Sequence, residues 1–148
     1  MLFHCAHKFK SVQKRIWKRT GSRAGRNCFS GVYCPVPEVV PDIRMSASGF
    51  LPYRVETKVG ETLRFVNTNS RLHTVTAYQD RIPEDADYFA SGGFETEKEA
   101  RDAWVKRLGG ALGTGETFEY TFSVAGTYHY FCVPHEIGGM VGIIEVRE

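Results

Sequence analysis

From residue 43 onward, hydrophobic and polar side chains alternate in short runs, and this pattern predicts β-strands. Between residues 53 and 59, for example, Tyr53, Val55, Thr57 and Val59 alternate with charged residues, which is the period of a half-buried strand. Comparable alternating or apolar runs predict further strands over residues 43–48, 63–67, 72–78, 117–123, 126–132 and 141–146. Glycine, proline and polar residues separate the runs, as turns between strands require.

One segment of the sequence follows a helical rather than a β pattern. Thr96 and Glu99 have the spacing of a capping box, in which the first residue caps the helix and the second reaches back to it. Apolar residues then recur at helical spacing up to a Gly-Gly pair at 109–110, which predicts a helix over about residues 97–108. We expect Trp104 to pack this helix against the strands.

The number and spacing of these elements define the expected fold. Seven or so short strands with regular turns, plus one helix, are typical of an all-β protein. We expect two antiparallel sheets packed as a β-sandwich and joined by Greek-key connections. The short helix lies in the connection that follows the 72–78 strand. A chain of 148 residues with 42% hydrophobic and 13% aromatic residues can form one such domain with a real core.

The first 41 residues differ in character from the rest of the chain. Residues 1–26 hold eight Lys or Arg and no acidic residue, whereas the remaining residues hold eleven basic and seventeen acidic ones, a net charge of −6. Prolines at 35, 37 and 41 mark an extended linker. We therefore predict a basic N-terminal segment at 1–41 and a folded domain at 42–148. We expect this segment to be a disordered tail or sequence from a misassigned start; the alternative is a short amphipathic helix over residues 8–19.

Cysteine and histidine residues in the N-terminal segment form no clear site. The four cysteines stand at positions 5, 28, 34 and 132, which is not the even framework of a disulfide-stapled domain. His4, Cys5 and His7 offer metal donors, but a terminus of this kind would bind metal non-specifically. Cys28 and Cys34 either form a local disulfide or remain free thiols. No function is assigned to these residues.

Three potential metal ligands stand close together near the C-terminus. Cys132, His135 and Met140 lie where the strand predicted at 126–132 gives way to the one at 141–146. A thiolate, an imidazole and a weakly bound thioether are donors that copper prefers, whereas methionine is a poor ligand for zinc, calcium or magnesium. A trigonal copper site with an axial methionine needs one more histidine.

His73 is the remaining histidine that fits this site. His4 and His7 lie in the N-terminal segment. His129 points away, because in a strand residues 128 and 130 share the face of Cys132 while residue 129 takes the other. His73 stands on a different strand, next to a loop. The predicted copper ligands are therefore Cys132, His73, His135 and, in the axial position, Met140.

Each of these residues could instead fill an ordinary structural role. A buried cysteine often acts as a small hydrophobic residue, a methionine in a Gly-Gly-Met turn can plug a core, and a lone histidine can serve as a hydrogen-bonding group. The combination of all four in a sandwich of this size favours a metal site over four separate structural roles.

The loop of Cys132, His135 and Met140 has a specific spacing, Cys-x2-His-x4-Met, and distinctive neighbours. Those neighbours are Gly126-Thr127-Tyr128, Pro134 and Gly139-Met140-Val141-Gly142. Together these motifs resemble the plastocyanin-type blue copper proteins of the cupredoxin family, including the archaeal halocyanin type. The spacing is similar to that of plastocyanins and pseudoazurins, whereas azurins have a longer loop and amicyanins a shorter one. The resemblance covers residues 43–148.

The resemblance implies a cupredoxin-like sandwich with one copper ion, cycling between Cu(I) and Cu(II), in a mobile or surface-attached one-electron carrier. Two residues depart from the family's pattern. Thr74 follows the first histidine where many members have an asparagine that ties the two ligand loops together, and threonine offers a hydroxyl for that tie. Phe131 precedes the cysteine where plant plastocyanins have a tyrosine on an electron route, so that route is not carried over.

The resemblance also implies how the protein meets its partners. Redox proteins dock on an apolar patch where the second histidine, His135, reaches the surface. Residues expected to form or extend that patch are Pro134, Ile137, Gly138, Gly139, Phe50, Leu51 and Pro52. Acidic residues that either steer a basic partner or form an ordinary solvated face are Glu84, Asp85, Asp87, Glu95, Glu97 and Glu99. We expect a monomer without a nucleic-acid partner.

Storage or delivery of copper is the alternative function, and fast redox exchange would distinguish a carrier from it. Catalysis is not expected, because the sequence lacks the His-x-His pairs, second domain or second cysteine of multicopper oxidases, nitrite reductases and terminal oxidases. The resemblance implies a location outside the cytoplasm, in a periplasm, in a lumen or at a cell surface. The sequence shows neither an apolar run long enough to span a membrane nor an export signal. We therefore expect membrane association only through a partner or an unseen anchor.

Overall fold

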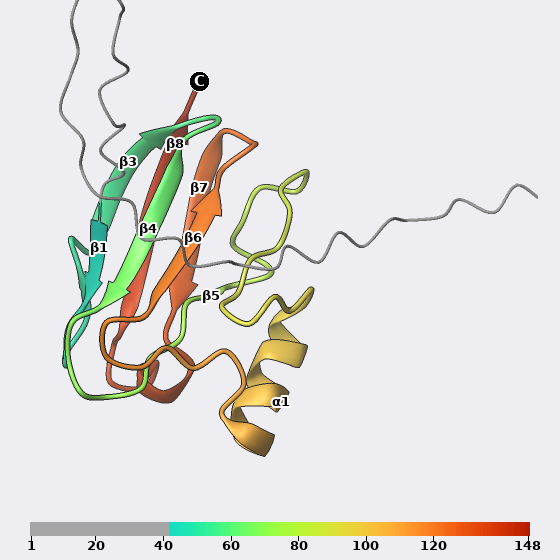
Figure 1. The fold of residues 1–148 in the computed structure, drawn as a ribbon. Coiled ribbons are helices and arrows are strands. Elements are labelled where there is room, and N and C mark those ends of the chain that lie inside the picture. The colour runs from blue at the N-terminus through green and yellow to red at the C-terminus, as the bar shows by residue number, and fades with distance from the viewer. Residues whose placement is uncertain (1–41) are drawn as a thin grey trace, which may run out of the picture. The chain divides into compact units, whose positions relative to one another are not determined.

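The described part of the chain is a sandwich of two four-stranded β-sheets (Figure 1). A computed structural model describes residues 42–148. The strands are β1 (Asp42–Met45), β2 (Phe50–Leu51), β3 (Arg54–Lys58), β4 (Thr62–Asn67), β5 (Thr76–Ala77), β6 (Thr117–Thr121), β7 (Gly126–Phe131) and β8 (Val141–Arg147). The helices are α1 (Glu97–Arg107) and the short 3-10 helix η1 (Val133–His135). The predicted two-sheet sandwich is confirmed, and its one α-helix lies in the connection from β5 to β6.

The two sheets are mixed rather than antiparallel, so that part of the prediction is wrong. The strand orders are β2-β1-β4-β6 and β3-β8-β7-β5. β1 runs parallel to β4 and β3 runs parallel to β8, whereas the other pairs are antiparallel. The cause is that the chain changes sheet at every connection from β2 to β7. Neighbouring strands are then separated by a crossover through the other sheet, which allows parallel pairing.

Alternating residues of the strands form the core between the sheets. In β4, Leu63 and Phe65 are fully buried while their neighbours Arg64 and Val66 are half-buried. Phe65 also packs edge to face with the rings of Phe50 and Tyr130, at centroid distances of 6.4 and 5.4 Å. Burial of such apolar surface is the main favourable contribution to folding.

The segment at residues 50–52 does not extend an exposed apolar patch as a whole. β2 pairs with β1, and its two residues point to opposite faces. Phe50 is therefore buried, with 1% of its surface exposed, while Leu51 is 47% exposed. Pro52 is also exposed. The prediction that Phe50 contributes to a docking surface is wrong, because the side chain belongs to the core.

The strand expected to carry the first ligand is shorter than the sequence pattern indicates. β5 covers two residues instead of the predicted 72–78. The backbone N–H groups that precede β5 donate to side-chain atoms instead of to another strand. The N–H of Thr74 points to the Cys132 Sγ atom at 3.3 Å, and the N–H of Val75 donates to the Ser91 hydroxyl at 3.0 Å. These donors are satisfied without a longer strand ladder.

The predicted helix is present as α1, and its start is capped as expected. Thr96 is the N-cap, and its side chain accepts the N–H of Glu99 at 3.2 Å. The Glu99 carboxylate accepts the N–H of Glu95 rather than that of Thr96, so the reciprocal bond is shifted by one residue. The helix ends at Arg107, and Leu108 takes a left-handed conformation one residue before the glycine pair.

α1 lies beside β5, outside the two sheets (Figure 1). Ala100 is its only buried residue, and Trp104, which was expected to pack against the strands, is half-buried. From the same helix, Arg101 forms an ion pair with Glu136 in the loop after β7. The helix is thus tied to the sandwich by charge as well as by packing.

Some predictions fall outside the described residues. They concern the basic segment at 1–41 as a separate region, the metal donors at positions 4, 5 and 7, and the pair Cys28 and Cys34. These statements remain predictions. Within residues 42–148, no helix has the length and apolar character that a membrane span needs.

Two tyrosines of β7 allow a test of how hydrogen bonding of a hydroxyl group in the core affects stability. The buried Tyr130 hydroxyl has no hydrogen-bond partner among the described residues, whereas the Tyr128 hydroxyl donates to the Val124 carbonyl oxygen at 2.7 Å. Tyr130→Phe should raise the free energy of unfolding by about 1 kcal/mol, because an unpaired buried polar group is destabilising. Tyr128→Phe, the control, should lower it by about 1 kcal/mol. Urea denaturation measures both, and equal losses in the two variants would refute the assignment.

Candidate metal centre

The loop after β7 and the segment before β5 bring three of the four predicted ligands together. The Cys132 Sγ atom lies 3.6 Å from Nδ1 of His73 and 3.4 Å from Nδ1 of His135. All three donor atoms lie within 4.8 Å of one another. Donors that bind one ion at about 2.0–2.3 Å each, as nitrogen and sulfur ligands of zinc do, must lie within about 4.6 Å. Both cysteine–histidine spacings satisfy that limit.

His73 is fully buried, and the side chain of Asn69 orients its ring. The Asn69 Oδ1 atom accepts the backbone N–H of Arg71 at 2.8 Å, and its Nδ2 group donates to the Met45 carbonyl oxygen at 2.9 Å. These two bonds fix the amide beside the ring, so that Nε2 of His73 lies 3.0 Å from the Asn69 Nδ2 atom and 3.2 Å from its Oδ1 atom. With the proton on Nε2 and donated to Oδ1, the lone pair of Nδ1 faces Cys132, which is the tautomer that metal binding at Nδ1 requires.

Burial sets the protonation of the three donors. It lowers the pKa of His73 to about 4, with further lowering by the charges of His135 and Arg71, and it also lowers the pKa of His135. Both imidazoles are therefore neutral at neutral pH, which is the form that binds metal. Burial raises the pKa of the Cys132 thiol, while the backbone N–H of Thr74 acts in the opposite direction. Metal binding would release the thiol proton.

Met140 is buried and closes the ligand loop through its backbone. The N–H of Cys132 donates to the Met140 carbonyl oxygen at 3.0 Å, and the N–H of Met140 donates to the His135 carbonyl oxygen at 3.1 Å. The two ends of the loop therefore meet beside each other. The role of Met140 as axial ligand stays a prediction.

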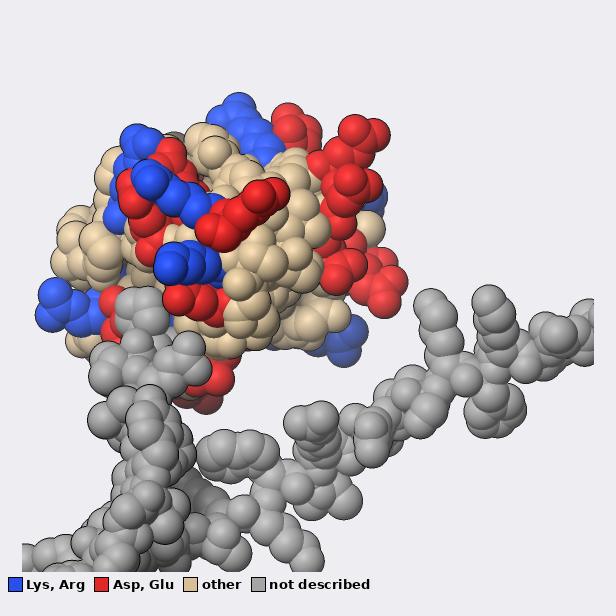
Figure 2. Space-filling view, turned by 90° about the horizontal axis from the view of Figure 1, so that it is seen from above, with Lys and Arg blue, Asp and Glu red and all other residues tan. Residues whose placement is uncertain are grey.

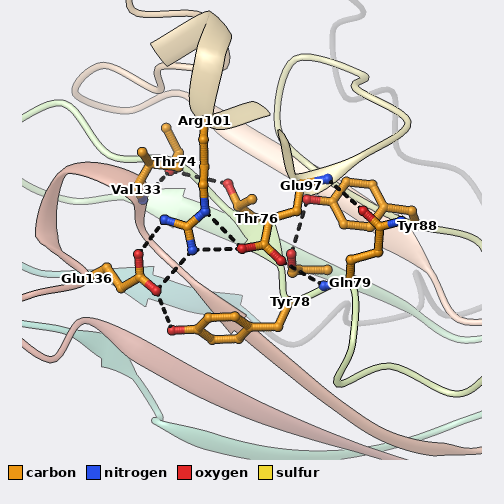
Figure 3. Close-up of polar contacts among 10 residues, drawn as sticks. Thr74, Thr76, Tyr78, Gln79, Tyr88, Glu97, Arg101, Val133 and Glu136 are labelled. Carbon is orange, nitrogen blue, oxygen red and sulfur yellow. Dashed lines mark hydrogen bonds and ion pairs between the residues drawn. The ribbon is translucent and has the colours of Figure 1, made fainter. Parts of the chain in front are cut away.

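Thr74 joins the two segments that carry the donors. Its Oγ1 atom accepts the N–H of Val133 at 2.8 Å (Figure 3), while its own N–H points to the Cys132 sulfur. The hydroxyl thus connects the segment of His73 with the loop of Cys132 and His135. A threonine supplies the tie for which many members of the resembled family use asparagine.

His129 stands apart from the site, as strand alternation predicted. Its β7 neighbours Tyr128 and Tyr130 are buried in the core, and His129 itself is half-buried. It is not part of the metal-binding group found among residues 42–148.

The sequence pattern did not single out Asn69 as part of the site. A signal was present, because Asn67, Asn69 and Arg71 are spaced for consecutive turns in which an asparagine side chain accepts the N–H two residues on. The contact between Arg101 and Glu136 had no such signal, since the two residues lie 35 positions apart. Only the folded chain places them together.

Comparison with known proteins identifies the family of the chain. Residues 38–147 match the family model of copper-binding proteins of the plastocyanin/azurin type. The chain belongs to the plastocyanin/azurin family. Its donors fit the metal of that family, because one thiolate and two neutral imidazoles are ligands that copper favours. Copper is therefore the cofactor of this plastocyanin-like protein.

The plastocyanin relatives differ in how much of their length the chain matches. Plastocyanin of Scenedesmus fuscus is 32% identical over 98 residues, covering 66% of this chain and 86% of the relative. Plastocyanin A'/A'' of Nicotiana tabacum is 33% identical over 98 residues, covering 66% and 87%. The chloroplastic plastocyanin of Physcomitrium patens is 31% identical over 100 residues, covering 68% and 51%. The chain thus spans about half the length of the Physcomitrium patens protein.

Solved structures of other copper proteins share the fold. A reduced amicyanin variant superposes with a TM-score of 0.54 at 20% identity, covering 76% of this chain and 87% of that one. At this identity the likeness shows the fold alone. A copper-containing nitrite reductase of Thermus scotoductus superposes with a TM-score of 0.55 at 26% identity, covering 76% of this chain and 23% of that one. The cupredoxin-like architecture expected from the sequence is confirmed.

The hydrogen bond between Thr74 and Val133 can be tested in the metal-free protein. Thr74→Val keeps the side-chain shape but leaves the Val133 N–H without its acceptor, so the free energy of unfolding should fall by about 1–3 kcal/mol. Hydrogen exchange at the Val133 amide should also accelerate. Thr74→Ser, the control, keeps the hydroxyl and should preserve the slow exchange. Equal protection of this amide in Thr74→Val and the parent would show that the bond contributes nothing.

Proposed function

We propose that the protein is a one-electron carrier whose copper ion is held by Cys132, His73, His135 and the axial Met140. The observation that carries the proposal is the preformed group of one buried thiol and two neutral imidazoles. Membership of the plastocyanin/azurin family supports copper as the occupant. The burial of Met140 in the same loop supports its role as the weak fourth ligand.

The surroundings of the donors favour electron transfer because they limit rearrangement. Copper supplies a one-electron change between Cu(I) and Cu(II), with no bond made or broken in a substrate. Asn69 holds the His73 ring, and Thr74 holds the loop through its hydroxyl. The N–H of Thr74 points to the Cys132 sulfur, where a hydrogen bond tunes the reduction potential. Donors held in one geometry suit both oxidation states with little reorganisation.

The proposed docking surface surrounds His135. This histidine is half-buried, whereas His73 is fully buried, so His135 is the ligand closer to solvent. Ile137, two residues further on, is fully exposed, and Leu72, next to His73, is 39% exposed. Exposed large apolar side chains beside a metal centre support docking of a redox protein at this surface.

Acidic residues form a second feature that would affect the choice of partner. Figure 2 shows acidic side chains gathered along one side of the domain. Glu84, Asp85 and Asp87 are exposed and are therefore placed to steer a basic partner at long range. Glu97, in contrast, pairs with Arg101 within the helix, so its charge is engaged in the structure.

We further propose a monomer that acts with redox proteins outside the cytoplasm. The relatives from Physcomitrium patens and Hordeum vulgare are chloroplastic plastocyanins, which supports such a location. A nitrite reductase shares the fold, so the carrier function rests on the site rather than on the architecture. Membrane association through a redox partner or an unseen anchor, and the absence of a nucleic-acid partner, belong to the same proposal.

Copper loading tests the metal and its ligands together. Protein loaded with Cu(II) should show an intense visible absorption band from thiolate-to-copper charge transfer. Cys132→Ser should abolish the band, because the donor sulfur is gone, and His135→Gln should weaken or shift it. His129→Gln is the control and should keep the parent spectrum, since His129 lies outside the group. Copper bound in equal amount without the band, or a band that survives in Cys132→Ser, would overturn the assignment.

Electron exchange with a basic c-type cytochrome tests the docking surface and the alternative function. Ile137→Glu should slow the exchange by about tenfold, a typical loss for one important apolar contact, without changing the visible band. Val105→Glu is the control, because Val105 is an exposed apolar residue on α1. Equal rates in both variants would exclude docking at Ile137. Copper that passes to an acceptor as an ion faster than it exchanges electrons would favour delivery.

A further inference from the structure

Arg101 of α1 reaches the loop that carries two of the proposed ligands (Figure 3). Its guanidinium donates to both carboxylate oxygens of Glu136, at 2.5 and 3.0 Å. Glu136 directly follows His135 and also accepts the Tyr78 hydroxyl at 2.9 Å. A two-point bond between guanidinium and carboxylate is strong for a polar contact, and it sets orientation as well as distance.

The same guanidinium also lies over the residue that precedes the cysteine ligand. The Cζ atom of Arg101 stands 4.2 Å from the centre of the Phe131 ring, and Phe131 is completely buried. The Tyr78 ring packs against Phe131 as well, with 4.3 Å between ring centroids. One arginine therefore contacts the neighbour of Cys132 and the neighbour of His135 at the same time.

Glu97 holds Arg101 in this position. Its Oε1 atom accepts Nε–H of Arg101 at 2.8 Å, one helical turn away, and its Oε2 atom accepts the N–H of Gln79 at 3.0 Å. The Gln79 side-chain oxygen accepts the N–H of Glu97 at 3.2 Å in return. Because Gln79 directly follows Tyr78, both donors to Glu136 are anchored at the start of α1.

The internal bonds of the ligand loop define its shape but not its position against the sheets. The N–H of His135 donates to the Cys132 carbonyl oxygen at 3.0 Å, and the N–H of Gly138 donates to the His135 carbonyl oxygen at 3.0 Å. Such bonds would persist if the loop turned as a unit. The position of the loop depends instead on bonds to other segments, which include those from Thr74 and Arg101.

We propose that Arg101 is a positioning residue for the copper centre. By bridging Phe131 and Glu136, it holds the Cys132–His135 segment between them in the geometry that binds metal. Its consequences for copper rest on the proposed function, whereas its effect on the loop does not. Lysine is a poor substitute, because an ammonium group lacks the planar two-point bond and the flat surface that lies on the ring.

The test compares Arg101→Met and Arg101→Lys with the control Lys98→Met. Methionine keeps the unbranched aliphatic part of the arginine side chain but removes its charge and its hydrogen-bond donors. Lys98 is on the same helix and forms an exposed ion pair with Asp102 at 2.6 Å. Both methionine variants therefore remove one ion-paired base from α1, but only one of them removes the bond to the loop.

Hydrogen exchange of the metal-free protein is the first readout. In Arg101→Met, the amides of Val133 and Thr74, whose hydrogen bonds join the loop to the segment of His73, should exchange about tenfold faster than in the parent, because the loop separates more easily from that segment. Lys98→Met should leave them unchanged. Unchanged exchange of these amides in Arg101→Met would overturn the proposal, whether or not the protein binds copper.

Copper retention and the copper spectra are the second readout. Arg101→Met should lose copper to a chelator about 10–100-fold faster, the usual effect of removing a residue that orients a ligand. The charge-transfer band and the copper hyperfine splitting should also shift, and Arg101→Lys should recover only part of each change. A parent-like spectrum with parent-like retention in Arg101→Met would refute the role. If the parent itself gives no charge-transfer band, the proposed function fails, while the exchange result still decides the role of Arg101.

Discussion

The structure depends on holding one thiol and two imidazoles close together at a largely buried position. Burial of polar groups is unfavourable unless each finds a partner, and here the partners are specific. The Asn69 amide lies within hydrogen-bond distance of Nε2 of His73, and the N–H of Thr74 points to the Cys132 sulfur. The Nδ1 atoms of both histidines face that sulfur. The two Nδ1 atoms and the sulfur therefore point to one place, where a copper ion would bind to all three.

This requirement explains why the chain departs from regular structure next to the site. β5 is short because the N–H groups before it serve Cys132 and the Ser91 hydroxyl instead of a neighbouring strand. Ser91 in turn donates to the Gly110 carbonyl oxygen at 2.7 Å. Gly110 comes so close that a Cβ atom there would collide with the Ser91 backbone, and its positive φ of 74° also favours glycine. The long connection with α1 is therefore fastened to the segment of the first histidine.

Much of this arrangement was predictable because it rests on local patterns. Strand alternation excluded His129 from the site, and donor chemistry together with spacing grouped Cys132 and His135 on one loop. The position of His73 beside them followed from the lack of another candidate. Features that depend on distant partners were not predictable. The parallel strand pairs, the burial of Phe50 and the bridge from Arg101 to Glu136 all arise from how the chain crosses between sheets.

We propose that the folded chain sets the geometry of the metal site before copper binds. Crystal structures of the metal-free and the copper-loaded protein test this most directly. We expect copper bound to Nδ1 of His73, Sγ of Cys132 and Nδ1 of His135, with each donor atom displaced by less than about 0.5 Å from its metal-free position. A copper ion bound elsewhere, or a His73 ring that must turn away from Asn69 to reach it, would show that the metal-free chain does not hold the site in its binding geometry.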